Sequence, residues 1–167
     1  MIVFTTKYKM KILKKALKLS YDRFKPNPFQ RRYHFTIAFD GNKPLLIAQN
    51  NPIKINHKAK RIGKQFNINT YQEFPYVHSE SHLISKLLDR YNSIDTNLSI
   101  VNVRINRQGI VLLSKPCNNC QKILQAVGLN KIYWTIDGNT FDSYHSDKII
   151  KINSKFTHYK LHHACVP

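Results

Sequence analysis

The sequence predicts an α/β fold in which a mixed β-sheet of about five strands is flanked by helices. One observation is the alternation in segment 32–40, whose apolar residues on one face are Tyr33, Phe35, Ile37 and Phe39. Another is the three- and four-residue apolar spacing of amphipathic helices, which occurs in 6–24, 78–91 and 117–128. Hydrophobic residues make up 42% of the 167 residues, so we expect a single domain over 1–167.

The first expected element is a basic helix over residues 6–24. Its apolar stripe should pack on the sheet and consists of Ile12, Leu13, Ala16, Leu17 and Tyr21. Lysines occupy the other positions: Lys7, Lys9, Lys11, Lys14, Lys15 and Lys18. They form either a solvated face of the helix or a set of contacts to phosphate groups. Pro26 and Pro28 end the helix, because proline cannot continue it. The core of the domain then follows over 31–153, with a short basic tail over 154–167.

The expected strands begin with a hairpin, in which 32–40 turns at Gly41-Asn42 into a strand over 45–48. Two further apolar runs, 98–106 and 110–114, form two strands or one long bent hairpin. A later strand has alternating Ile132, Trp134 and Ile136, and a candidate final strand covers 148–152. About ten residues separate these last two runs, too few for a crossover helix, so we expect them to pair antiparallel.

The charge is the unusual part of the composition. The chain has 27 basic and 9 acidic side chains, a net charge of +18, which indicates a polyanionic partner. Nucleic acid is the first candidate and an anionic membrane surface the second. Residues 53–77 lack periodicity and combine cations with aromatic rings, which suits a single-stranded polynucleotide. The candidate contacts are Lys54, Lys58, Lys60, Arg61 and Lys64. The alternative is a solvated basic loop whose aromatic residues cover the core.

The cysteine count and the apolar runs indicate the compartment. Three cysteines, two of them assigned below to a metal, leave no disulfide framework and favour a reducing compartment. No apolar run approaches the length of a membrane span, and the apolar residues 1–4 are too few for a secretory signal. We therefore expect a cytoplasmic or nuclear protein that is not secreted and does not bind a membrane. A homo-oligomer is compatible with the sequence, as is a monomer.

Two short motifs carry the chemistry, His78-Ser79-Glu80 and Pro116-Cys117-Asn118-Asn119-Cys120. His78, Cys117 and Cys120 are three ligands for Zn²⁺ and leave the fourth tetrahedral position to water, which is the catalytic arrangement. The two cysteines share one face of a helical first turn, and a helix N-terminus favours the thiolate. Glu80 is not needed as a ligand and is free to transfer protons. His78 and Glu80 converge only if their helix begins near 77–79.

The order H-x-E and then P-C-x-x-C resembles the signature of the cytidine deaminase-like superfamily, zinc-dependent nucleoside and nucleobase deaminases, over roughly residues 31–137. The resemblance implies a three-layer fold with zinc at the N-termini of two helices. It also implies hydrolytic deamination, cytosine being favoured over adenine, with Glu80 as the general acid and base. Its implied substrate contacts are Asn50, its rival Asn51, Ser114 and Lys115. Many relatives carry Glu or Ser where this chain has Lys115, a departure that affects base recognition and not zinc binding.

Two other functions stay open. An enzyme acting on free cytidine or deoxycytidine nucleotides shares the zinc site but does not need the charge of +18. A catalytically inert zinc-containing protein that binds nucleic acid has no use for the carboxylate of Glu80. A second metal site in the tail is disfavoured because its ligand spacing fits no usual zinc pattern: His158, His162, His163 and Cys165.

Overall fold

A computed structural model of the chain describes residues 2–69, 76–144 and 150–151. In this part of the chain the main sheet has seven strands in the order β2-β1-β5-β7-β8-β9, with β6 paired to β5. The strands are β1 (Arg32–Asp40), β2 (Lys43–Gln49), β5 (Ser99–Asn106), β6 (Val111–Leu112), β7 (Lys131–Thr135), β8 (Thr140–Ser143) and β9 (Ile150–Lys151). β5 and β7 pair in parallel and the other neighbours antiparallel, so the expected mixed sheet is confirmed.

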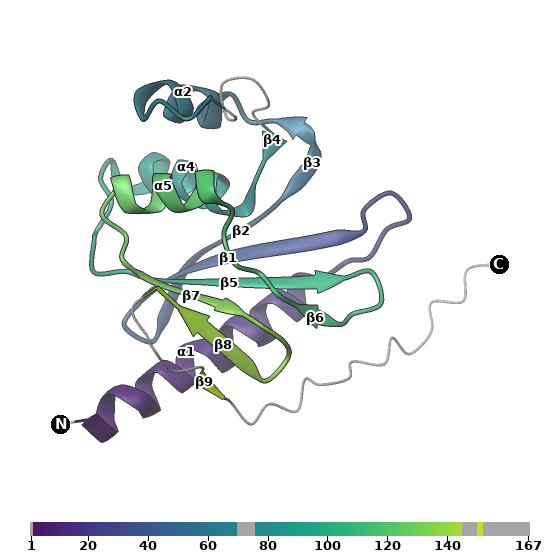
Figure 1. Cartoon of the computed structure of the whole chain (residues 1–167), viewed down its shortest axis with the longest axis vertical. Coiled ribbons are helices and arrows are strands. Elements are labelled where there is room, and N and C mark those ends of the chain that lie inside the picture. The colour runs from purple at the N-terminus through teal and green to yellow at the C-terminus, as the bar shows by residue number, and fades with distance from the viewer. Residues whose placement is uncertain (1, 70–75, 145–149, 152–167) are drawn as a thin grey trace.

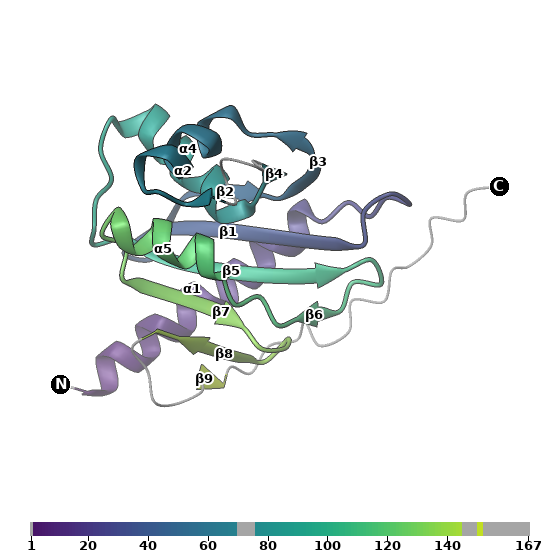
Figure 2. The same ribbon diagram turned by 45° about the horizontal axis from the view of Figure 1, so that its top comes forward.

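Helices cover both faces of this sheet (Figures 1 and 2). α1 (Ile2–Arg23) lies on one face, and α4 (Ser79–Tyr91) and α5 (Asn118–Ala126) lie on the other. α2 (His57–Gln65) contacts α4 on the side away from the sheet. The alternation of β1 explains the two cores: Phe35 and Ile37 pack with α1, whereas Ala38 packs with α4 and α5. A helix–sheet–helix arrangement results, with the main apolar clusters on the two faces of the sheet.

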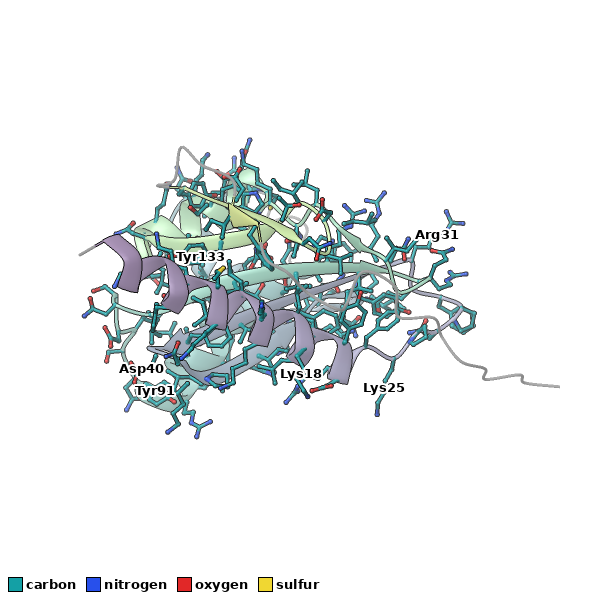
Figure 3. All side chains as sticks on the ribbon, turned by 90° about the horizontal axis from the view of Figure 1, so that it is seen from below. Lys18, Lys25, Arg31, Asp40, Tyr91 and Tyr133 are labelled. Atoms are coloured by element: carbon teal, nitrogen blue, oxygen red, sulfur yellow. The ribbon has the colours of Figure 1, made fainter. Side chains whose placement is uncertain are left out.

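The basic N-terminal helix is confirmed and begins earlier than expected, at Ile2. Its stripe is fully buried against the sheet and consists of Ile12, Leu13, Ala16 and Leu17. Several lysines lie on the exposed side: Lys11, Lys14, Lys15 and Lys18. Figure 3 shows this side of the molecule, with Lys18 on α1 and Lys25 just beyond its end. Because α1 and the metal-ligand motifs lie on opposite faces of the sheet, the lysines of α1 are remote from that site.

The prediction that residues 53–77 form a long connection without regular structure is wrong. It contains most of β3 (Asn51–Ile55), α2 and β4 (Tyr76–Val77), and β3 and β4 form a separate antiparallel pair. Asn56 caps α2, its Oδ1 accepting from the backbone N–H groups of Lys58 and Ala59, each at 3.1 Å. The buried face of α2 is short, with Ala59 and Ile62 as its apolar side chains, so the helical period is hardly visible in the sequence.

The last strands also differ from the expectation. β8 lies between β7 and β9 and pairs antiparallel with both, so the direct pairing of 132–136 with 148–152 is wrong. Asp137 explains the tight turn before β8, since its Oδ1 accepts from the N–H groups of Asn139 and Thr140. The hairpin of β5 and β6 is confirmed. The tail over 154–167, including His158, His162, His163 and Cys165, and the aromatic Tyr71 and Phe74 lie outside the described residues.

Candidate metal centre and active-site pocket

The two motifs meet at the N-termini of α4 and α5. His78 is the N-cap of α4, which confirms the expected helix start near 77–79, and Cys117 is the N-cap of α5. His78 Nδ1 lies 3.6 Å from Cys120 Sγ and 3.9 Å from Cys117 Sγ. Within the described residues the three ligand atoms all lie within 4.8 Å of one another. The cysteines follow His78 by 39 and 42 residues, so two distant segments converge on one point.

The geometry of this group fits a metal ion. A tetrahedral zinc with usual Zn–N and Zn–S bonds separates its ligand atoms by about 3.5–3.8 Å, which is close to the two N–S distances here. One imidazole and two thiols are a donor set that zinc accepts. The described residues can therefore hold a metal ion, consistent with zinc, with three protein ligands.

The electrostatics of the group favour a thiolate. Hydrogen bonds from the Cys120 side chain and from His78, with the backbone N–H of Cys120, lower the pKa of Cys117 to about 4 against the cost of its burial. The Cys120 N–H reaches Cys117 Sγ at 3.5 Å, because the N-terminus of α5 offers unsatisfied N–H groups. The hydrogen bond with Cys117 is also the main cause that raises the pKa of His78. A negatively charged ligand is thus present before a metal binds.

Glu80 lies buried beside the ligands, in the first turn of α4, with 5% of its surface exposed. Ser79 Oγ donates to its Oε2 at 3.1 Å, and Asn102 Nδ2 donates to its Oε1 at 3.0 Å. Thr36 Oγ1 donates in turn to Ser79 Oγ at 2.8 Å. Burial is the main cause that raises the pKa of Glu80. The result is a fixed carboxyl group that holds a proton at higher pH than an ordinary glutamate does.

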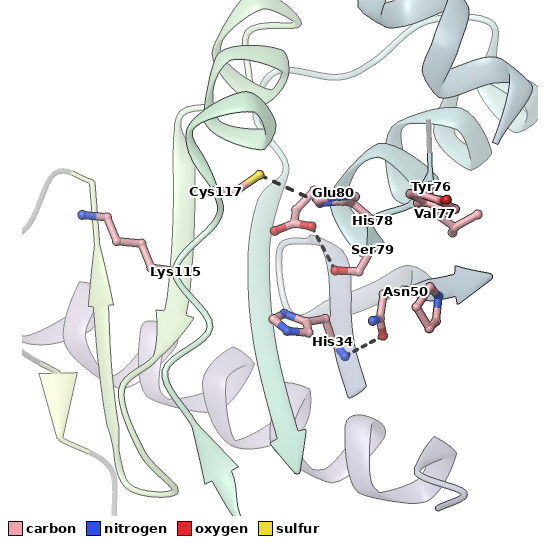
Figure 4. Close-up of a pocket in the computed structure, with 10 residues that line it drawn as sticks. His34, Asn50, Tyr76, Val77, His78, Ser79, Glu80, Lys115 and Cys117 are labelled. Atoms are coloured by element: carbon pink, nitrogen blue, oxygen red, sulfur yellow. Dashed lines mark hydrogen bonds between the residues drawn. The ribbon is translucent and has the colours of Figure 1, made fainter. Parts of the chain in front are cut away.

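His78, Cys117 and Glu80 border one cavity of about 370 Å³. Figure 4 shows its lining, which is His34, Asn50, Pro52, Tyr76, Val77, His78, Ser79, Glu80, Lys115 and Cys117. The volume lies at the lower end of the range for small-molecule sites. Burial lowers the pKa of His34 to about 4, with smaller contributions from nearby cations, so its imidazole is neutral at pH 7. A neutral imidazole and a buried carboxyl group therefore line the same cavity as two candidate metal ligands, His78 and Cys117.

The structure separates the two candidate asparagines. Asn50 lines the cavity, and its Oδ1 accepts from the backbone N–H of His34 at 2.9 Å and from Gln30 Nε2 at 3.2 Å. Asn51 is not among the residues that line it, and its Oδ1 accepts from the N–H groups of Ile53 and Lys54. Asn51 thus shapes the start of β3. Substrate contact by either residue stays a prediction, and Asn50 has the position for it.

The other two expected substrate contacts also lie in different places. Ser114 is buried and does not line the cavity; its hydroxyl donates to the Asn102 carbonyl at 2.8 Å and accepts from the Thr135 N–H. It therefore braces the backbone of the residue that contacts Glu80. Lys115 lines the cavity, although its side chain extends away from Glu80 in Figure 4, and its Nζ lies 5.6 Å from the Trp134 ring centroid. Their contacts with a substrate stay predictions as well.

The five expected nucleic-acid contacts lie together on β3 and α2: Lys54, Lys58, Lys60, Arg61 and Lys64. Lys58 pairs with Asp89 of α4. β3 also contributes Pro52 to the cavity wall, so the strand that carries Lys54 borders the cavity, although none of the five cations lines it. Whether these cations bind nucleic acid stays a prediction.

The sequence analysis did not identify three residues of the site, His34, Thr36 and Asn102, and it gave Ser79 no role of its own. These three residues are polar, and each lies between buried apolar neighbours in its strand: His34 and Thr36 on β1 and Asn102 on β5. Polar side chains at such positions need hydrogen-bond partners. That pattern was a usable signal, but it does not show which partner each residue meets.

The fold and site define a mixed α/β protein with a candidate metal centre beside a buried carboxyl group. No protein-family model, no curated protein and no solved structure matches this chain. No helix among the described residues is long and apolar enough to cross a membrane. The function is therefore inferred from the geometry and chemistry of the site.

Proposed function

We propose that this protein is a zinc-dependent hydrolytic deaminase of a nucleobase, with cytosine favoured over adenine, acting within single-stranded DNA or RNA. The observation that carries the proposal is the buried carboxyl group of Glu80 on the same cavity as the ligands His78 and Cys117. A structural zinc site uses four protein ligands and has no need of a buried carboxyl group beside it. The match to the H-x-E and P-C-x-x-C signature of the cytidine deaminase-like superfamily supports the same reaction.

His78, Cys117 and Cys120 would hold the zinc ion, which when bound lowers the pKa of a water molecule. Glu80 does the proton transfer: it accepts a proton at its carboxylate and delivers it to the ring nitrogen of the base. The oxygen of that water adds to the ring carbon that bears the amino group. Glu80 then takes the remaining proton of the added hydroxyl group and passes it to the amino group, so that the C–N bond breaks, ammonia leaves and the hydroxyl becomes the carbonyl of the product. The raised pKa of Glu80 suits both directions of transfer near neutral pH.

The neighbouring residues orient this chemistry. Asn102 and Ser79 each donate to one oxygen of the Glu80 carboxylate, which restricts its rotation. Asn50 and the neutral His34 line the same cavity and are the polar side chains proposed to face the edge of a bound base. A free nucleoside would use the same cavity, but it has no phosphates to meet the net charge of +18, whereas a polynucleotide has many. For that reason the polymer is the preferred substrate.

The test is a deamination assay on single-stranded DNA, single-stranded RNA, free cytidine and free adenosine, with the zinc content measured. Glu80→Ala should keep one zinc per chain and lose turnover by a factor of about 10²–10⁴ or more. Ser20→Ala is the control, because Ser20 is buried on α1, on the opposite face of the sheet, and its hydroxyl donates to the Ala16 carbonyl.

Each outcome has a defined meaning. Turnover of Glu80→Ala at the wild-type rate would refute the role of Glu80. Conversion of free cytidine alone would replace the polymer by a free nucleoside as the substrate. No conversion of any substrate by the zinc-loaded wild type would refute the proposed activity on these bases.

A further inference from the structure

Two further hollows adjoin the catalytic cavity on one side. The first, of about 740 Å³, shares Asn50 and Val77 with the cavity and reaches Lys54, Lys58 and Lys86. The second, of about 410 Å³, shares His57 with the first and is lined by α2. The three hollows therefore follow one another from the metal ligands, past the start of β3, to the exposed side of α2.

The side chains along the two outer hollows are strongly cationic. Six Lys or Arg side chains line them, against the single carboxylate of Asp89, which already pairs with Lys58. Lys86 donates to the Ile47 carbonyl at 3.0 Å, so it is also engaged within the protein. Among the described residues no ion pair or hydrogen bond engages the side chains of the remaining four cations: Lys54, Lys60, Arg61 and Lys64. Within the described part of the chain, these four positive charges therefore have no protein partner and can meet a ligand.

α2 presents three of these charges on one helix face. Ala59, Ile62 and Gly63 are buried against the rest of the molecule. Consequently the exposed face carries Lys60, Arg61 and Lys64. Lys60 and Lys64 are four residues apart, a spacing at which like charges destabilise a helix, and α2 has no acidic residue to offset them. A polyanion on this face would remove that repulsion.

The path also offers surfaces for bases. Tyr76 lines the catalytic cavity with 43% of its surface exposed, and it pairs across the β3–β4 ladder with Ile55, which is 55% exposed. An exposed aromatic ring in the cavity next to a cationic hollow suits a single strand, whose phosphates meet the cations while its bases stack. A duplex would hide its bases from Tyr76.

We infer that the three hollows form one track for a single-stranded nucleic acid. The target base occupies the cavity, and the nucleotides that flank it on one side only occupy the two outer hollows. This inference rests on the proposed function for the base in the cavity. The flank passes Asn50 and Val77, meets Lys54, and continues along Lys60, Arg61 and Lys64. The cations that contact phosphate therefore lie on the α2 side of the sheet and not on α1. An anionic membrane is disfavoured because these cations line hollows in succession instead of a flat face.

The test compares two triple variants that remove the same charge. Lys60→Gln/Arg61→Gln/Lys64→Gln changes the exposed face of α2. Lys11→Gln/Lys14→Gln/Lys25→Gln, all exposed, changes α1 and its end on the opposite face of the sheet. Binding of a labelled single-stranded 12-nucleotide homopolymer is measured against salt. Each phosphate contact contributes about −0.7 to the slope of log K against log salt, so removing three contacts should make the slope of the α2 triple variant less negative by about 2. At 0.1 M salt this corresponds to an affinity about 100-fold lower than that of the wild type.

The α1 triple variant should change the affinity less than threefold, and Arg61→Gln alone should reduce the slope by about 0.7. Equal losses in the two triple variants would overturn the track, because the charge would then act as a diffuse field. The track is also overturned if the α2 triple variant loses binding to anionic phospholipid vesicles and keeps its affinity for the oligonucleotide. Circular dichroism melting of each variant separates a binding defect from unfolding.

A second measurement tests the one-sided path. The kcat/KM of deamination is compared for oligonucleotides that carry six nucleotides only 5′ or only 3′ of the target base. One flank should raise kcat/KM over that of the free nucleotide, and the α2 triple variant should abolish that gain. Equal gains from both flanks would overturn the one-sided path. If no substrate is deaminated, the proposed function fails, whereas the binding series still decides whether the track exists.

Discussion

Asn102 provides the sharpest test of how the site works, because only the structure identifies it. Its amide donates to Glu80 Oε1 at 3.0 Å, and both side chains are buried, with 3% and 5% of their surfaces exposed. Asn102→Ala removes this donor where water has little access. A hydrogen bond to an ionised acceptor contributes about 1.5–3 kcal/mol, so kcat/KM for deamination should fall by about 10-fold to 150-fold.

The pH profile gives a second measurement on the same variant. The Asn102 amide stabilises the ionised form of Glu80, so its loss raises the pKa of Glu80 further. Glu80 accepts a proton only when ionised, so the acidic limb of the kcat/KM profile should move to higher pH. Val103→Ala is the control, because Val103 is buried on the other face of β5 and its loss lowers stability without touching Glu80. Wild-type kcat/KM and an unshifted profile in Asn102→Ala would refute this role of the amide.

Three further predictions concern the metal, the pH and the fold. Cys120→Ala should reduce the zinc content measured by mass spectrometry well below one per chain, and stoichiometric zinc in this variant would contradict the ligand set. The folded state disfavours charged His34, whose pKa falls from 6.5 to about 4, so stability should decrease as the pH falls through this window. His34→Gln should reduce the fall in melting temperature between pH 6.5 and about 4. A pH dependence equal to that of the wild type would contradict this role of His34. Gly128→Ala should destabilise by about 1–2 kcal/mol, because φ is +81° and a Cβ would lie 2.7 Å from Thr96 Cγ2. In the double variant Gly128→Ala/Thr96→Ser, the loss of stability measured by chemical unfolding should be smaller than in Gly128→Ala alone. If the effects of the two single substitutions simply add, the contact with Thr96 is contradicted.

The elements that sequence reasoning predicted well have long, regular patterns. The stripe of α1 and the alternation of β1 each extend over enough residues to determine the element and its buried face. α2, β3 and β4 were missed because they have only two to nine residues: α2 has three buried positions and β3 and β4 have none, which leaves no visible period. β8 was missed for the same reason, because it is four residues long and has one buried position.

The sequence by itself determined the candidate metal ligands and the carboxyl group proposed for proton transfer, since each motif is local and each begins a helix. Only the tertiary structure decided which residues complete the site. Asn102 reaches Glu80 from 22 residues away, and Thr36 reaches Ser79 from 43 residues away, through the pairing of β1 with β5 beneath α4. Such contacts depend on strand register and on the packing of a helix over the sheet, and neither is encoded within a single segment.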